Sequence, residues 1–192
     1  NNPVFRDQNV PNRYVYTGYF GAGAFKLLQV LGQWQPQWGT AAGAGSLAVN
    51  PGGGNDPGTF DVATAGYYTY TFTTVGQGGS YTVAPFDAST STTYSTMGII
   101  GAATANGWGS DTFMTQDPNN PHLWNIRNVA LTAGQFKFRA NSNWGTNWGD
   151  NGSTQNYGTA LFNAPNNISI ATAGTYNIWF NDLDRSYIII PQ

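Results

Sequence analysis

The sequence predicts an all-β protein made of two tandem antiparallel β-sandwiches, and three observations predict this class. Runs of alternating β-branched, aromatic and polar residues are frequent, and clusters of Gly, Asn, Asp and Pro separate them. No stretch carries apolar residues at helical spacing over three turns. The chain also repeats its own motifs, which indicates two copies of one module. Many short strands joined by glycine-rich turns are typical of β-sandwiches.

The expected strands are short runs in which side chains alternate between two faces of a sheet. "YYTYTFTTV" and "QFKFRAN" illustrate the pattern, with aromatic residues at every second position. Turn-forming residues bound each run. In chain order, the runs expected to form strands are 13–20, 25–31, 67–75, 80–86, 97–103, 123–131, 135–141, 167–171, 174–181 and 185–191.

Two pairs of segments repeat along the chain. Residues 14–40 parallel residues 123–150, because each has a strand, then Ala-Gly, Phe-Lys and a loop with two tryptophans, the second followed by Gly. Residues 61–85 parallel residues 169–191, because each has Ala-Thr-Ala-Gly, an aromatic-rich strand, a turn and a closing strand around Ser-Tyr. Repetition of this kind predicts two copies of one structural module.

The repeats predict a first module at 1–86, a short polar linker at 87–95 and a second module at 96–192. The second module opens with "MGIIGAATANGWGS", which has no counterpart in the first. We therefore expect the first module to lack its first strand and the chain to begin inside it. Without that strand, the first module would carry an exposed sheet edge, which natural sandwiches usually avoid.

Composition excludes several classes of function. Only 8% of residues are charged and the net charge is −2, against about 25% charged residues in an ordinary domain. Seven basic residues do not form the groove or patch that nucleic acids require. The chain has no cysteine, which excludes disulfides, thiolate catalysis and cysteine-based zinc sites. No apolar run approaches the roughly 20 residues that cross a bilayer, and no signal peptide is visible.

Signals of catalysis are weak. His122 is the single histidine, and no G-x-S-x-G motif is present. Glycoside hydrolysis needs two carboxyl groups that flank one bond. Asp111, Asp117 and Asp150 are candidates, but each lies in a turn context, where aspartate is common for other reasons. We therefore predict a protein that is not an enzyme and uses no cofactor or metal.

A candidate binding surface centres on strand 135–141 and the loop after it. Alternation predicts that the two phenylalanines of this strand point into the sandwich, whereas Lys137 and Arg139 face solvent. The following loop holds Trp144 and Trp148. Flat rings can cover the apolar face of a sugar while basic and amide groups bind its hydroxyls, so this grouping without carboxylates favours a neutral glycan.

Each of these residues also has a purely structural interpretation. Trp124 and Trp179 lie within alternating strands and are expected in the core. Trp108 and Trp144 lie in loops rich in Gly, Asn and Ser, which favours exposure. Trp148 either binds a ligand or anchors its own loop. Lys137 and Arg139 are either ligand-binding donors or ordinary solubilising charges.

The first copy predicts a possible second site of similar kind. Lys26 corresponds to Lys137, and Trp34 and Trp38 correspond to the two tryptophans of the second copy. Leu28 stands at the position of Arg139, so one charged donor is lost. We therefore expect any site in the first copy to be weaker.

The second copy resembles a known family in several combined motifs. These are Ile-Ile-Gly-x-Ala-Thr before Gly-Trp, then Ala-Gly-x-Phe-Lys-Phe-Arg, Trp-Gly and Ala-Gly-Thr-Tyr, all within residues 97–192. Together they resemble the tandem starch-binding modules of SusE/SusF-type outer-membrane lipoproteins. The resemblance covers nearly all of 97–192 and residues 1–86 less fully.

The resemblance implies a non-catalytic protein of immunoglobulin-like β-sandwiches. It implies a location on the extracellular face of the outer membrane of a Gram-negative bacterium, where such proteins bind starch or other α-glucans for polysaccharide utilisation. The expected partners are a TonB-dependent importer and its binding lipoprotein. Membrane attachment would be through a lipid anchor alone, although this sequence has no cysteine to carry it.

The family's ligand contacts carry over to Trp108, Lys137, Arg139 and Trp144, and Asn143, Asn147 and Trp148 join them by their position in the loop. One alternative function stays open. A structural or adhesive protein of the cell surface or of a fibre would share the low charge and the paired sandwiches. In that case the tryptophan loops would form protein–protein contacts instead of binding a glycan.

Overall fold

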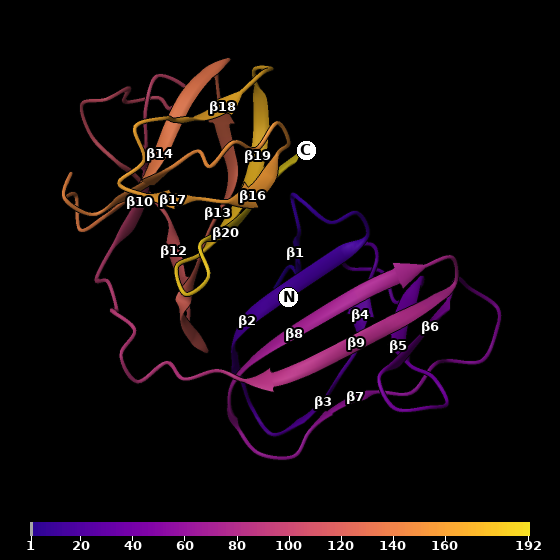
Figure 1. Ribbon diagram of the computed structural model, residues 1–192. Coiled ribbons are helices and arrows are strands. Elements are labelled where there is room, and N and C mark those ends of the chain that lie inside the picture. The colour runs from indigo at the N-terminus through magenta and orange to yellow at the C-terminus, as the bar shows by residue number, and fades with distance from the viewer. Residues whose placement is uncertain (1) are drawn as a thin grey trace. The chain divides into compact units, whose positions relative to one another are not determined.

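The computed structural model describes residues 2–192 and is built from β-strands and turns, with no helix in that range (Figure 1). The predicted all-β class is therefore confirmed. No helix that could span a membrane occurs between residues 2 and 192. Contacts divide the chain into two units, the first mostly Val10–Asp87 and the second mostly Ala88–Gln192. The segment Phe5–Asn9 belongs with the second unit, although the sequence analysis assigned it to the first module.

Most predicted strands occur close to their expected bounds, and the observed set adds several short ones. In chain order the strands are β1(Phe5–Arg6), β2(Arg13–Phe20), β3(Gly23–Phe25), β4(Leu27–Leu28), β5(Gln37–Thr40), β6(Ser46–Asn50), β7(Phe60–Val62), β8(Gly66–Val75), β9(Gly78–Pro85), β10(Met97–Ile100), β11(Thr112–Phe113), β12(Thr115–Asp117), β13(Asn120–Leu131), β14(Gly134–Ala140), β15(Asn147–Gly149), β16(Tyr157–Thr159), β17(Leu161–Phe162), β18(Ile168–Ile170), β19(Gly174–Asn181) and β20(Ser186–Pro191).

The first unit consists of a large antiparallel sheet and a small one. The large sheet has the order β2-β8-β9-β6-β5-β4, and β3 pairs with β7. Strands β8 and β9 form the long hairpin that Figure 1 shows in magenta. Aromatic rings fill the core, because every second residue of β8 points inward; Phe72 stacks with Tyr70 and meets Phe60 edge-on. The core therefore follows directly from the alternation of the sequence.

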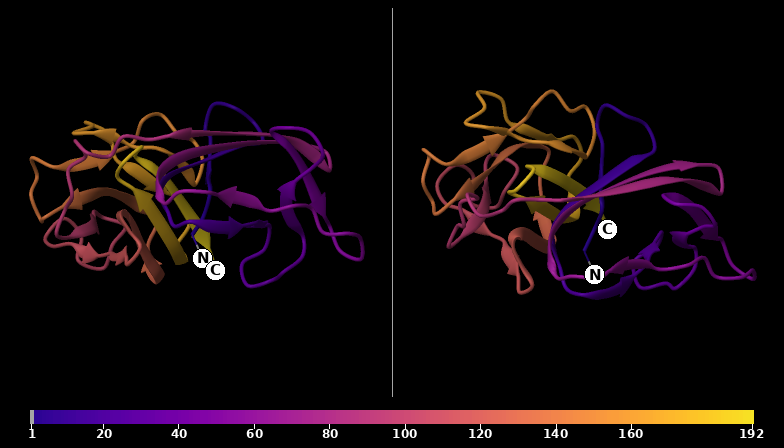
Figure 2. Two further views of the ribbon diagram at one scale, coloured as in Figure 1. Left: turned by 90° about the horizontal axis from the view of Figure 1, so that it is seen from below. Right: turned by 60° about the horizontal axis from the view of Figure 1, so that its bottom comes forward.

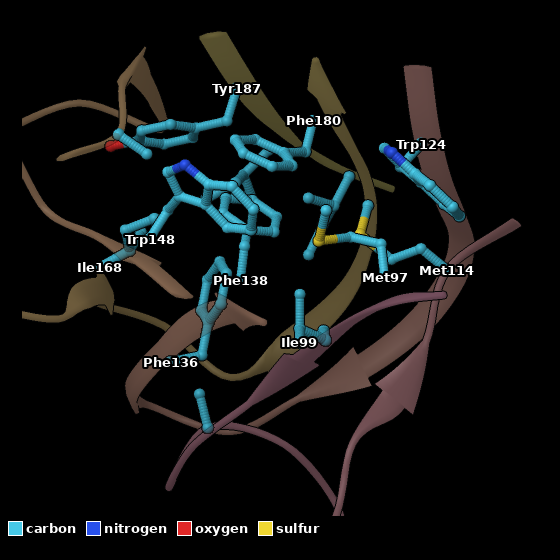
Figure 3. Close-up of a cluster of buried hydrophobic side chains, with 14 of the residues drawn as sticks. Met97, Ile99, Met114, Trp124, Phe136, Phe138, Trp148, Ile168, Phe180 and Tyr187 are labelled. Carbon is cyan, nitrogen blue, oxygen red and sulfur yellow. The ribbon is translucent and has the colours of Figure 1, made fainter. Parts of the chain in front are cut away.

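The second unit is a β-sandwich of two antiparallel sheets. One has the order β11-β10-β14-β15-β17, and the other has the order β12-β13-β19-β20-β16. The hairpin β19–β20 of the second sheet is yellow in Figure 1 and in the views of Figure 2. Phe138 of β14 stacks on Phe180 of β19 across the core, with ring centroids 4.2 Å apart (Figure 3). Trp124 and Trp179 are buried, as the sequence predicts.

The repeated Ala-Thr-Ala-Gly motif forms the same local structure in both units. In the first, the hydroxyl of Tyr68 donates to the carbonyl of Thr64 at 2.8 Å. In the second, the hydroxyl of Tyr176 donates to the carbonyl of Thr172 at 2.5 Å. A tyrosine that bonds back to the backbone just before its own strand fixes the entry of the chain into the sheet. The sequence repeat therefore corresponds to a repeat of structure.

The repeated Trp-Gly motif also has a common physical cause. At Gly39 a side chain would overlap the carbonyl oxygen of Gly58, and at Gly149 it would overlap that of Asn166. The residue after each glycine donates its backbone N–H to the same carbonyl. Glycine is therefore required at both positions because another backbone segment approaches too closely for a β-carbon.

Candidate functional site

Trp108 and Trp144 lie together on the surface of the second unit. Trp108 is 43% exposed and Trp144 is 48% exposed, so both rings are open to solvent as the sequence predicts. Their ring centroids are 6.1 Å apart and the ring planes are inclined by 37°. We call this pair the tryptophan platform. Exposed aromatic rings that gather in this way mark a contact surface.

Turns hold both platform loops in defined positions. In the loop that carries Trp108, the backbone N–H of Gly101 donates to Gly107, and the buried Thr104 hydroxyl donates to the Gly101 carbonyl at 2.9 Å. In the loop that carries Trp144, the side chain of Asn143 accepts the N–H of Gly145 at 2.8 Å. The side-chain carbonyl oxygen of Asn143 is therefore already used to stabilise this turn. Rigid loops of this kind lower the entropy that a ligand must remove.

The expectation that Arg139 faces solvent is wrong. Its side chain is only 7% exposed and forms a two-pronged ion pair with Asp111, with Nε–Oδ1 at 2.9 Å and Nη2–Oδ2 at 2.8 Å. The hydroxyl of Ser142 donates to the same carboxylate at 2.6 Å. The alternation along β14 was read correctly, but the loop before β11 folds over this face and covers it. The Arg139 guanidinium carbon lies 4.5 Å from the centre of the Trp144 ring, so the cation supports the platform from beneath.

Lys137 is also buried, which contradicts the same expectation. Its ammonium group donates to the carbonyl of Ala164 and to Oδ1 of Asn147. Burial lowers the pKa of Lys137 below its usual value. The Asn147 amide group donates to the carbonyl of Trp144 at 2.7 Å and to Asn163 at 3.0 Å. Lys137 and Asn147 therefore connect the platform loop to the body of the unit and do not project toward a ligand.

Of the two interpretations of Trp148, the structural one agrees with its position. Its ring is 3% exposed and belongs to the core of the second unit (Figure 3). It meets Tyr94 and Phe162 edge-on, with centroids 5.5 Å and 5.6 Å away, and packs on Phe180. Because Trp148 pairs with Phe138 in the β14–β15 ladder, its side chain points to the same face as that core residue.

An open hollow of about 460 Å³ adjoins the platform. Phe113 is 57% exposed and stands on β11, two residues beyond Asp111. The sequence analysis considered Asp111 only as a possible catalytic carboxylate and missed Phe113 and Ser142. Because side chains two positions apart in a strand point to the same face of the sheet, the spacing of Asp111 and Phe113 could have predicted that they lie on one face. The hollow is lined by Gly109, Ser110, Asp111, Phe113, Arg139 and Ser142.

The site carries no net charge of its own, because the Arg139 guanidinium and the Asp111 carboxylate neutralise each other at close range. Arginine has five N–H donors, and Asp111 accepts from two of its nitrogens. The remaining donors of Arg139 bond to no other residue between 2 and 192. The arrangement therefore combines flat apolar rings with hydrogen-bond donors and an uncharged surface.

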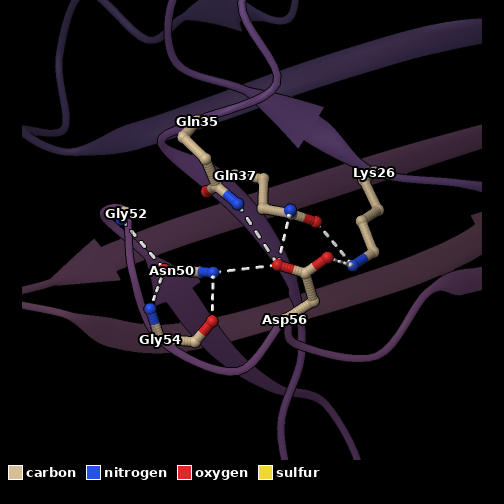
Figure 4. A network of polar contacts seen from close by, with 7 residues as sticks. All are labelled: Lys26, Gln35, Gln37, Asn50, Gly52, Gly54 and Asp56. Atoms are coloured by element: carbon tan, nitrogen blue, oxygen red, sulfur yellow. Dashed lines mark hydrogen bonds and ion pairs between the residues drawn. The ribbon is translucent and has the colours of Figure 1, made fainter.

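The possible second site, in the first unit, contains a different polar network (Figure 4). Lys26 donates to Oε1 of Gln37 at 2.5 Å and lies 4.0 Å from Oδ2 of Asp56. Hydrogen bonds from Asn50, and then from Gln35 and Gln37, hold the pKa of the Asp56 carboxyl below its usual value. A carboxylate with several amide donors stays ionised and fixed in orientation.

The tryptophans of the first unit differ in exposure. Trp34 is 60% exposed, and the ammonium of Lys26 lies 6.0 Å from its ring centre. Trp38 is half-buried and packs against the core of the first unit. Lys26 and Trp34 thus lie together at the surface, whereas Trp38 lies with the core. Asp56 was missed by the sequence analysis, because it follows a glycine-rich turn that gave no structural signal.

A buried triad of polar groups lies within the second unit. His122 Nδ1 is 2.6 Å from Oδ1 of Asp182, and the Trp124 indole donates to Oδ2 at 2.7 Å. Burial raises the pKa of Asp182, and hydrogen bonds from His122 and Trp124 offset part of that rise. All three side chains are shielded from solvent, so the triad satisfies buried polar groups and does not contact a substrate. Within residues 2–192 no cluster of three potential metal ligands occurs.

Comparisons with known proteins include a distant structural likeness. No protein-family profile matches the sequence, and no curated protein matches it. Among solved structures, SusF from Bacteroides thetaiotaomicron matches this chain with 13% identity and a TM-score of 0.35. The alignment covers 97% of this chain and 42% of that protein. The chain therefore spans less than half the length of the structure that it matches.

Proposed function

We propose that this protein binds a neutral polysaccharide, most favourably an α-glucan such as starch, without catalysis. The tryptophan platform carries the proposal. Two exposed rings 6.1 Å apart offer apolar surfaces to two neighbouring sugars of one chain. Their inclination of 37° suits a chain whose successive sugars turn relative to one another, as in α-1,4-glucans. A flat crystalline chain such as cellulose would need coplanar rings.

The charge of the site supports a neutral ligand. Asp111 cancels the charge of Arg139 at the edge of the platform, and the chain as a whole has few charges. A site for an acidic glycan would present an uncompensated cation. The motifs that resemble SusE/SusF-type proteins point in the same direction, toward starch and polysaccharide utilisation.

The experiment is gel retardation by a soluble α-glucan, with wild-type protein and Trp144→Ala. A tryptophan has about 250 Å² of surface, so an exposed fraction of 48% leaves about 120 Å². Arg139 occupies one face, and a sugar on the other face would cover about 60 Å², worth about 1.5 kcal/mol. Affinity should therefore fall about tenfold, which abolishes retardation at a weak site. Leu161→Ala, an exposed change in the same unit, is the control and should migrate like wild type.

Tryptophan fluorescence separates the glycan proposal from the structural or adhesive alternative. Maltoheptaose should shift the emission of the wild type, because Trp108 and Trp144 are exposed and lose water on binding. No shift, together with retardation that is unchanged in Trp144→Ala, would reject the glycan site. Proteins captured through the same rings would then support a protein-contact surface.

The motif resemblance is the only basis on which we also propose a cellular location and partners. The protein would act on the outer face of a Gram-negative outer membrane, attached by a lipid, beside a TonB-dependent importer and its binding lipoprotein. Protease treatment of intact cells should then degrade the protein. Full protection in intact cells, with degradation after lysis, would contradict a surface location.

A further inference from the structure

The hollow beside Phe113 is continuous with the tryptophan platform through one residue. Arg139 lies 4.5 Å beneath the Trp144 ring and also lines the hollow. Gly109, which follows Trp108 in the sequence, also lines the hollow, so the platform and the hollow are neighbours. The two features form one surface, with Arg139 at the junction.

The hollow is built from a hydrophobic ring and buried polar groups. Phe113 is 57% exposed, although exposure of so large an apolar side chain in water is unfavourable. Arg139 is 6% exposed, and its N–H groups that Asp111 does not use have no acceptor among residues 2–192. These N–H groups are not among the fully buried polar atoms that lack a partner, so they reach the surface of the hollow and can donate to a ligand there. A hydroxyl-bearing ligand with one apolar face would satisfy both groups together.

We propose that this hollow is a further sugar subsite, in which Phe113 covers the apolar face of an uncharged sugar and Arg139 donates to its hydroxyls. The inference rests on the proposed glycan function and adds to it a minimum ligand length. Two sugars occupy the platform, and the next sugar of the same chain occupies the hollow. Asp111 keeps the subsite electrically neutral, so a neutral sugar is favoured over a uronic acid.

The test is a series of affinities for maltose, maltotriose, maltotetraose and maltoheptaose, measured by calorimetry on the full chain. Phe113→Ala should weaken binding of the longest oligosaccharide about five- to tenfold, the contribution of one aromatic stacking contact. Maltose should bind the variant and the wild type equally, because it fills the platform alone. Phe113→Trp should preserve or improve binding of the long ligands. Leu161→Ala is the control, and circular dichroism verifies that each variant is folded.

The outcomes separate this inference from the proposed function. If the wild type binds no oligosaccharide, the proposed function fails. If the wild type binds, Trp144→Ala does not, and Phe113→Ala is unchanged at every length, the subsite is rejected and the platform remains. An equal loss for maltose and maltoheptaose would also reject the subsite, because Phe113 would then act on the platform itself.

Discussion

The ion pair between Arg139 and Asp111 connects the stability of the second unit to its candidate site. The two side chains are 7% and 1% exposed, and two charge-assisted hydrogen bonds of 2.9 Å and 2.8 Å join them. Removing one partner leaves the other charge buried and uncompensated, which costs about 3–5 kcal/mol. A domain has a total stability of only about 5–15 kcal/mol. Substitution of either Arg139 or Asp111 alone should therefore remove a large part of the free energy of unfolding of this unit.

A double-mutant cycle measures this coupling. Asp111→Ala and Arg139→Met should each lower the free energy of unfolding by about 3–5 kcal/mol. The double variant should be less destabilised than the sum of the two by about 2–3 kcal/mol, because neither charge remains buried. Urea unfolding followed by tryptophan fluorescence gives the free energies, and the transition of the second unit is assigned by its own tryptophans.

Arg127→Met is a matched control for this cycle. Arg127 also lies over an indole, at 5.0 Å from the ring centre of Trp179, but it is exposed and has no buried carboxylate. Its removal should change the free energy of unfolding by less than about 1 kcal/mol. The reasoning would be refuted by single variants at Arg139 and Asp111 that behave like this control. Additivity of the double variant within about 0.5 kcal/mol would refute it as well.

Two further predictions concern alkaline stability and the first unit. Burial raises the pKa of Tyr187 to about 12. The folded phenol therefore stays protonated while the unfolded one ionises near pH 10, so stability should fall between about pH 10 and pH 12. Tyr187→Phe should reduce that fall in thermal unfolding and cost little at pH 7, because the hydroxyl has no hydrogen-bond partner among the described residues. An equally steep alkaline loss in the variant would contradict this account. Trp34→Ala should weaken glycan retardation less than Trp144→Ala does; an equal or greater loss would contradict the expectation that the first-unit site is the weaker one.

The strands with regular alternation could be predicted from the sequence. Residues 13–20 and 174–181 match β2 and β19 from end to end, because alternation and bounding turns were both present. Short strands such as β5 and β15 were missed. Their residues centre on Trp-Gly, and their pairing depends on distant backbone segments that a local pattern does not reveal.

The side chains of the site could be predicted less well than the strands. Alternation assigned Lys137 and Arg139 to the correct face of β14, opposite the core phenylalanines. It could not reveal that distant segments cover that face, through Ala164 over Lys137 and Asp111 over Arg139. Exposure of Trp108 was predictable because its loop is polar and glycine-rich. Burial of a charged residue depends on a partner that is remote in sequence, and one sequence does not identify that partner.

The two units support their exposed tryptophans by the same chemistry with different residues. In the second unit Arg139 lies beside Trp144 and pairs with Asp111. In the first, Lys26 lies beside Trp34 and has Asp56 as its nearest carboxylate, 4.0 Å away. The sequence repeat aligns Lys26 with Lys137, and each lysine donates to the side-chain amide oxygen of the residue before Trp-Gly, Gln37 in the first unit and Asn147 in the second. A cation beside the ring and a carboxylate near the cation occur in both units, at shorter distances in the second. The two units therefore share the lysine–amide contact beside Trp-Gly, and each also has a cation beside an exposed indole.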